Sequence, residues 1–376
     1  FPPAESVSSR SPTRVVAALS SLPRMLLLLS PTKTLDETPY PANLKAKITL
    51  PRMFSGEAHE PPPAKSVLKE LQKLSKPKLK SLLGVSDNLA DLNHKRYCKF
   101  ESQSSKPAMW MYSGPAFQAL SPAKYNNEQI DYAQKHLRIL SGLYGLVRPC
   151  DAIQPYRIDM GKKLSVEGAK DLYEYWRPFI ATEINDQLQA LDGEKTAIVS
   201  CASNEYFKAV DVKAMPSDIR VITCAFQEPS GRTASVYAKR ARGMMCRFAI
   251  ESNAQTPEDL LTFQGYPEME TYEYSSSKSS ESLFVFVRTG GGGGGGRGSS
   301  SGSKRKSAKG TTDRKSTNKA SSAKRKTSMA KKAKADDEGG EGKDAGHGQG
   351  SKRKGTRSSA RTTTRSSRKR AKQSST

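Results

Sequence analysis

A run of seven glycines, Gly290 to Gly296, limits how much of this 376-residue chain can fold. From Arg297 to Thr376 the sequence holds 25 Lys and Arg against 6 Asp and Glu, and it contains no Phe, Trp or Tyr. Such a segment cannot bury enough apolar surface to offset the entropy lost on ordering. We therefore predict a flexible glycine linker at 290–296 and a disordered basic tail at 297–376.

The first 24 residues, like the tail, carry an excess of basic over acidic residues. Arg10, Arg14 and Arg24 stand against one acid, Glu5, among many Ser and Pro. This bias is similar to that of an organelle transit peptide, and an unstructured leader explains it equally well. The remaining residues, 25–289, are enough for one large domain with a substantial core. No apolar run approaches the roughly 20 residues needed to span a membrane.

Short apolar runs and helical periodicities alternate irregularly across this core. Strands are predicted at 25–29, 196–201, 219–226, 233–237 and 283–287, and helices at 64–75, 78–84, 86–97, 127–141, 169–191 and 237–251. Ser86 and Asn127 are the predicted N-caps. Because no clean strand–helix–strand alternation is present, we predict a single α+β domain around a mixed or antiparallel sheet, not a doubly wound one.

Cysteine and histidine spacing argues against a metal site and against a disulfide framework. The five cysteines are widely spaced without a C-x-x-C, and the four histidines have no ligand spacing. No glycine-rich dinucleotide motif or Walker motif occurs. We expect no metal, no cofactor and a reducing compartment.

The loop after the first predicted strand carries a candidate anion-binding residue. It reads Ser30-Pro-Thr-Lys-Thr-Leu-Asp36, and a lysine on such a loop is a natural phosphate partner. The alternative is that Ser30 and Thr34 cap a turn while Lys33 is solvated. Glu205 follows a later strand in the same way, and it is either a functional carboxylate or an acid at a helix start.

Residues 79–92 match the helix-hairpin-helix pattern, in which two short helices flank a glycine-containing turn. Gly84 is the glycine of the turn, and Ser86 replaces the second glycine. In such a hairpin, backbone N–H groups face a DNA phosphate. Lys80 adds positive charge nearby. A plain helix pair with a capped turn explains these residues about as well.

The segment from His136 to Gly161 combines Gly, Pro, Arg and Tyr at close quarters. Gly142 and Gly145 are predicted to form a backbone nest for an anion, with Arg148 and Arg157 beside it. The alternative is a helix that ends at Gly142 and continues into a tight packed turn. The stretch Pro155-Tyr-Arg157 reads as exposed.

A basic helix is predicted around residues 237–251. Its apolar stripe leaves Lys239, Arg240, Arg242 and Arg247 on other faces. Cations near a helix N-terminus oppose the helix dipole, so an anionic partner is expected. A solvated basic face is the alternative.

Taken in this order, these motifs closely resemble the YaaA family of peroxide-stress proteins over roughly residues 25–288. The resemblance rests on five stretches, which are 25–36, 136–161, 202–208, 237–248 and the closing 265–266 with 284–288. It implies a cytosolic protein of hydrogen peroxide defence that limits intracellular iron and binds DNA through a helix-hairpin-helix in an unusual α+β fold. One departure is that Met111-Tyr-Ser-Gly-Pro-Ala-Phe117 stands where the family often has Phe-x-Gly-Asp-Val-Tyr.

The tail has no counterpart in the short bacterial form. Its recurring clusters, Lys304–Lys306, Lys324–Lys326, Lys352–Lys354 and Arg368–Arg370, are typical of nuclear-import or phosphate-binding segments. Three features predict different locations for the protein. The family resemblance indicates the cytosol, the basic tail indicates the nucleus, and the leader indicates an organelle. A solubility tail or an RNA-facing arm is the alternative for residues 297–376.

Two classes of function follow from these patterns. The leading hypothesis is a non-catalytic, monomeric stress protein that binds DNA backbone with little sequence preference and has no membrane partner. The rival is an enzyme that acts on a nucleotide-like or phosphorylated substrate. For the rival, five residues would have to converge in one anion-lined cleft: Lys33, Arg157, Glu205, Lys239 and Arg242.

Overall fold

The computed structural model describes residues 24–40, 48–191 and 196–291. The basic tail, most of the leader and residues 292–296 of the predicted linker lie outside the described residues. Arg24 and the first two linker glycines belong to strands, because β1 is Arg24–Leu29 and β9 is Leu283–Gly291. No helix of the described residues is long and apolar enough to cross a membrane.

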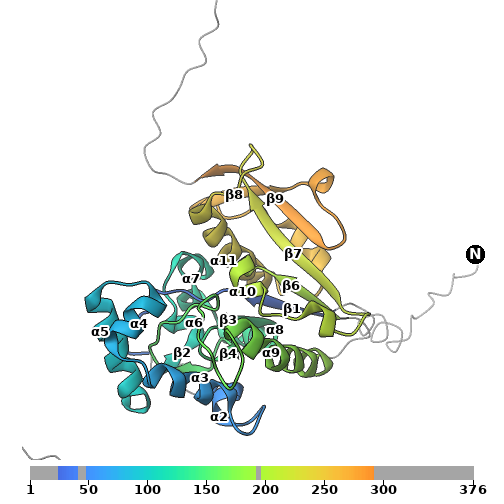
Figure 1. The fold of residues 1–376 in the computed structure, drawn as a ribbon. Helices are drawn as coiled ribbons and strands as arrows, with labels where there is room; N and C mark the ends of the chain where they lie inside the picture. Colours follow the sequence, from blue (N-terminus) through green and yellow to red (C-terminus); the bar gives the residue numbers. More distant parts are fainter. Residues whose placement is uncertain (1–23, 41–47, 192–195, 292–376) are drawn as a thin grey trace, which may run out of the picture. The chain divides into compact units, whose positions relative to one another are not determined.

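A seven-stranded mixed sheet organises the domain, in the order β4-β3-β1-β6-β7-β9-β8 (Figure 1). The pairs β3/β1, β1/β6, β6/β7 and β7/β9 are parallel, and the two edge pairs, β3/β4 and β8/β9, are antiparallel. The α+β class with a mixed sheet is therefore confirmed. The remaining strands of this sheet are β3 (Leu137–Ser141), β4 (Gly145–Val147), β6 (Thr196–Ser200), β7 (Arg220–Gln227) and β8 (Glu270–Tyr274).

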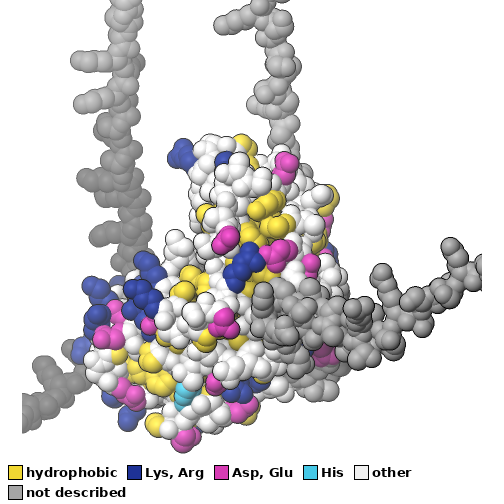
Figure 2. Space-filling model, turned by 90° about the vertical axis from the view of Figure 1, so that its right-hand side faces the viewer, with side chains coloured by type: hydrophobic (Ala, Val, Ile, Leu, Met, Phe, Trp, Pro, Cys, Tyr) yellow, Lys and Arg dark blue, Asp and Glu magenta, His cyan; other side chains and the backbone are white. Residues whose placement is uncertain are grey.

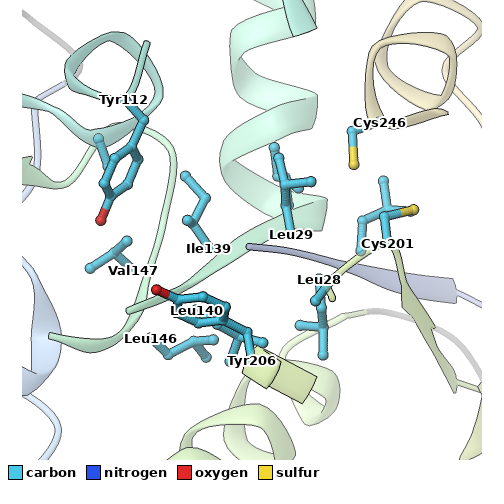
Figure 3. Close-up of a cluster of buried hydrophobic side chains, with 14 of the residues drawn as sticks. Leu28, Leu29, Tyr112, Ile139, Leu140, Leu146, Val147, Cys201, Tyr206 and Cys246 are labelled. Atoms are coloured by element: carbon cyan, nitrogen blue, oxygen red, sulfur yellow. The ribbon is translucent and has the colours of Figure 1, made fainter. Parts of the chain in front are cut away.

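Strand β1 lies in the interior of the sheet, and both of its faces are apolar. Met25 to Leu29 are all at most 1% exposed. Figure 3 shows Leu28 and Leu29 on opposite faces of the strand, Leu29 on the side of Cys246 and Leu28 on the side of Tyr206. Such an uninterrupted apolar run is typical of a parallel strand that is covered on both sides.

Most of the helices lie between β1 and β3 in the sequence. They are α2 (Arg52–Ser55), α3 (Pro63–Gln72), α4 (Lys76–Leu83), α5 (Asp87–Cys98), α6 (Ala108–Met111), α7 (Pro115–Leu120) and α8 (Asn127–His136). The later ones are α9 (Leu172–Gln189), α10 (Asn204–Phe207) and α11 (Ser235–Glu251). A small antiparallel pair joins β2 (Lys106–Pro107) to β5 (Ala152–Ile153). Helix α11 packs along β7 and β1 and against α7.

Two of the predicted elements are wrong. Residues 137–141 continue the predicted helix in sequence but form β3, because a fully buried apolar run suits either structure and pairing with β1 decides it. Residues 233–237 were expected to be a strand, and α11 begins there at Ser235. The N-cap of α8 is Asn126 rather than Asn127, with a capping box that includes Gln129.

Candidate functional site

The topological switch point of the sheet lies at the carboxyl ends of β1 and β6, where the connections that leave the neighbouring strands run to opposite sides. From β1 the chain goes first to β3 on one side, and later to β6 on the other side. The loops that leave the two neighbouring strands therefore diverge, which opens a crevice above the sheet. Ligands of open α/β sheets bind at such switch points.

A cleft of about 320 Å³ lies at this point. Its walls come from the loop after β1, the residues after β6, the start of α7 and the basic helix α11. The lining residues are Leu29, Ser30, Pro31, Thr32, Lys33, Thr34, Pro115, Ala116, Asp159, Ser203, Glu205, Tyr206, Lys239 and Arg242. Four of the five residues that the enzyme hypothesis required to converge are in this set. Arg157 is not.

Three pairs of lining residues contact one another in the cleft. The amide N–H of Ser203 donates to Oγ of Ser30 at 2.8 Å, and the two hydroxyl oxygens lie 3.2 Å apart, so the loops after β1 and β6 are joined. Nζ of Lys33 lies 2.9 Å from Oδ2 of Asp159, whose side chain is 8% exposed. The hydroxyl of Tyr206 also approaches Asp159, at 3.4 Å. The negative charge of Asp159 thus offsets the charge of Lys33.

The other two cations of the cleft come from α11 and are less engaged. Arg242 is partly buried, and its Nε is a buried donor with no hydrogen-bond partner in the described structure. Burial lowers the pKa of Arg242, while nearby Cys201 acts in the opposite direction. Lys239 is exposed at the rim of the cleft. Since the two residues are three positions apart, they share one face of the helix.

Glu205 belongs to the short helix α10 at the edge of the cleft. Its carbonyl oxygen accepts a hydrogen bond from the hydroxyl of Tyr173 at 2.7 Å. A Cβ added to Gly161 would come within 3.0 Å of Oε1 of Glu205, so this glycine leaves room for the carboxylate. The carboxylate itself is exposed.

The remaining cations of α11 are held by acids outside the cleft. Arg240 forms an ion pair of 2.9 Å with Glu270. Arg247 is buried, bonds Glu251 at 2.8 Å and lies 3.7 Å from the ring centre of Tyr266. From the sequence, the four cations of this helix were predicted to bind one anionic partner. The structure divides them into two that line the cleft and two that bind the helix to its surroundings.

The glycine pair at 142 and 145 is packed against the protein itself. A Cβ on Gly142 would lie 2.4 Å from the carbonyl oxygen of Ile158, and one on Gly145 would lie 2.6 Å from the ring of Trp176. The N–H groups of residues 143 and 144 already donate to Oγ of Ser141. The predicted anion nest therefore has no support in this geometry, and the predicted helix end at Gly142 is a β-hairpin turn.

The two arginines of that segment lie outside the cleft, and the side chain of Arg148 is paired elsewhere. Arg148 pairs with Asp151 at 3.1 Å and donates to the carbonyl oxygen of Leu50 at 3.2 Å. The backbone oxygen of Arg157 accepts from the hydroxyl of Tyr97 at 2.6 Å. Neither arginine lines the cleft.

Tyr156 is buried, so the expectation that residues 155–157 are exposed is wrong for this side chain. It is 5% exposed, and its hydroxyl lies 2.6 Å from that of Tyr112 and 2.7 Å from that of Ser141. Burial raises the pKa of Tyr156 to about 12. The hydroxyl of Tyr156 is therefore part of a buried hydrogen-bond network and not of an exposed surface.

The residues of the predicted helix-hairpin-helix form two helices, α4 and α5, which lie side by side in Figure 1. Gly84 takes the left-handed conformation at φ +66° and ends α4. Ser86 is the N-cap of α5 by its backbone, but its side chain makes no capping bond. Lys80 pairs with Asp87 at 2.8 Å, and Lys162 donates to the carbonyl oxygen of Leu83 at 2.9 Å.

Sequence reasoning missed Asp159 and the Ser30–Ser203 contact. Asp159 stands within the segment that was singled out, two residues after Arg157, and only the fold shows that it faces Lys33. Three buried cysteines, Cys201, Cys224 and Cys246, also interact with one another in the core beside Arg242. In residues 24–40, 48–191 and 196–291 no group of three or more His, Cys, Asp or Glu could hold a metal ion.

Comparison with known proteins matches this chain to one family. The family model of the peroxide stress protein YaaA matches residues 25–278. A UPF0246 protein of Maricaulis maris (strain MCS10) is 41% identical over 244 residues, which cover 64% of this chain and 88% of the relative. A UPF0246 protein of Delftia acidovorans (strain DSM 14801 / SPH-1) is 39% identical over 252 residues, which cover 64% and 92%.

Proposed function

Because this chain belongs to the family of the peroxide stress protein YaaA, we propose that it acts in the response to hydrogen peroxide by binding the phosphate backbone of DNA. Bound protein would limit iron-driven damage to the DNA that it covers. The observation that carries the DNA-binding part is the hairpin of α4 and α5, in which no side chain caps the start of α5.

The start of α5 is suited to a phosphate. An α-helix leaves its first N–H groups without intrahelical partners, and its dipole favours a negative charge there. Gly84 turns the chain so that α4 ends next to this N-terminus. A phosphate oxygen would supply the acceptor that the Ser86 side chain does not.

Lysines beside the hairpin supply the charge. A groove next to α4 is lined by Lys73, Lys78, Lys162 and Lys163, with Glu70 as its acid. Lys78 and Lys163 are exposed. On the hairpin itself acids offset part of the charge, since Asp87 pairs with Lys80 and Asp91 pairs with Lys95. Figure 2 presents another face of the molecule, on which Lys and Arg are likewise mixed with Asp and Glu. We therefore expect only a few phosphate contacts from the core.

The test measures duplex DNA binding by fluorescence anisotropy, with the full chain and with a chain that ends at Gly291. The shorter chain removes the tail's cations, which would bind DNA without any help from the hairpin. With about 4 phosphate contacts, log K should fall with log salt at a slope of roughly −3.6. The double variant K78E/K163E of the shorter chain should bind at least about tenfold more weakly at low salt.

The matched control is Lys213→Glu. Lys213 is exposed, belongs to the 3₁₀ turn 212–214 and lines neither the groove nor the cleft. K213E changes the charge by as much as each of the two groove substitutions, K78E and K163E, so a general electrostatic effect would also appear in the control, at about half the size seen in the double variant. Equal affinity of the wild type and K78E/K163E would refute the role of the hairpin.

A further inference from the structure

We propose that the cleft at the ends of β1 and β6 binds a small phosphomonoester that also carries hydroxyl groups, such as a nucleoside monophosphate or a sugar phosphate. This proposal is independent of DNA binding by the hairpin, because the two use different residues. It develops the second class of function that the sequence indicated, a protein that acts on a phosphorylated small molecule.

The first support is the state of the Arg242 side chain. Its Nε is buried without a partner, although a buried donor normally has one. The described residues give this donor no acceptor, and because Arg242 also lines the cleft, the rest of its guanidinium can face a ligand there. A guanidinium presents its N–H donors in a planar fork that matches two oxygens of a phosphate.

The second support is the balance of charge. Asp159 offsets Lys33 through their ion pair of 2.9 Å. Lys239 and Arg242 then face the same cleft from one side of α11, with Glu205 as the remaining acid. Two cations from adjacent turns of one helix fit a phosphate dianion better than a single carboxylate, which carries one negative charge.

The third support is the size and position of the cleft. A volume of about 320 Å³ is at the lower end of the range for small-ligand sites, roughly 300–1,000 Å³. It accommodates a molecule of the size of a mononucleotide and is too small for a duplex. Its position is at the switch point of the sheet, and such ligands bind at the switch points of open α/β sheets.

The remaining polar residues of the cleft explain the hydroxyl groups of the proposed ligand. Glu205 offers an exposed carboxylate, and Ser30 and Thr32 offer hydroxyls. These groups accept hydrogen bonds from sugar hydroxyls. The phosphate would lie toward Arg242 and Lys239, and the sugar toward Glu205.

The experiment is isothermal titration calorimetry of the full chain with inorganic phosphate, AMP, glucose 6-phosphate and adenosine. We expect binding of the phosphate-containing probes and none of adenosine. Stronger binding of AMP than of glucose 6-phosphate identifies a nucleotide site, and the reverse identifies a sugar phosphate site. Equal binding of all three phosphate-containing probes would refute recognition of the ligand's hydroxyl groups, because the phosphate group alone would then be recognised.

Variants locate the bound phosphate. K239A and R242Q should each weaken binding at least about tenfold, since each removes a charge-assisted contact. K213A removes the same charge elsewhere and should bind like the wild type. Lys239 is exposed, so K239A keeps the test valid even if R242Q fails to fold.

Three results would overturn the proposal. They are no binding of any phosphate-containing probe by the folded wild type, unchanged affinity in K239A, and binding of adenosine as strong as that of AMP. Displacement of AMP bound to the wild type by duplex DNA would assign the cleft to the DNA surface instead. A loss of DNA binding in K78E/K163E with AMP binding unchanged would separate the two sites.

Discussion

Gly243 marks the closest approach between α11 and the start of α7, and replacing it with alanine should lower stability. A Cβ at this position would lie 1.8 Å from the carbonyl oxygen of Ala116. Real Cβ contacts essentially never fall below 3.0 Å, so the two helices must separate by about 1.2 Å. The obstacle is backbone, which cannot turn away as a flexible side chain would.

The magnitude follows from two opposing effects. Overpacking of this kind costs about 3 kcal/mol, at the upper end of its usual range, because the contact is with backbone. Alanine favours a helix over glycine by about 1 kcal/mol. The net loss is about 2 kcal/mol, or a fall in Tm of about 4–8 °C for a domain of this size.

Urea denaturation and thermal unfolding of G243A measure this loss, with Gly168→Ala as the control. Gly168 has open space around its Cβ position but a φ of +88°, so its substitution adds backbone strain without a steric clash. We expect about 1 kcal/mol for the control. An unchanged or higher Tm for G243A would refute the packing argument. AMP binding by G243A should also weaken, since Arg242 is the adjacent residue.

Three further outcomes are expected. D159N removes the partner of Lys33 and should lower stability by about 1 kcal/mol, which a thermal melt would detect. A hydrogen bond from Thr38 helps lower the pKa of Asp36 from 3.8 to about 2. This carboxylate therefore stabilises the fold above pH 4 and loses that effect as the pH falls toward 2, so T38V should lose less stability over that interval. In the native protein only the exposed Cys98 should react rapidly with a thiol reagent, and the four buried cysteines only after unfolding.

The sequence was sufficient for the residue types of the cleft but not for their arrangement. Lys33 and Glu205 were found because each follows a predicted strand, and parallel neighbouring strands bring such loops together. Lys239 and Arg242 could not be separated from Arg240 and from the buried Arg247 by spacing alone. The difference depends on where Glu270 and Glu251 stand, which is a tertiary property.

The fold was predictable where the pattern was local. Helices with polar and apolar faces were placed within a few residues, as for α4, α5 and α9. Residues 137–141 failed because a fully buried segment has no periodicity to read. Gly142 and Gly145 were correctly predicted to be positions where only glycine fits. The groups that approach them closely are Ile158 and Trp176, not a bound anion.

The interior place of β1 in the sheet has a consequence for how the chain is made. This strand is synthesised well before its partners, which are Leu137–Ile139 on one side and Thr196–Ser200 on the other. A nascent chain shorter than these residues carries an apolar strand with both edges unpaired, which is prone to aggregate. Pairings so distant in sequence also slow folding. We therefore expect chains truncated before residue 196 to depend on chaperones, and pulse-labelled ribosome-bound chains to gain protease resistance only after β6 has left the ribosome.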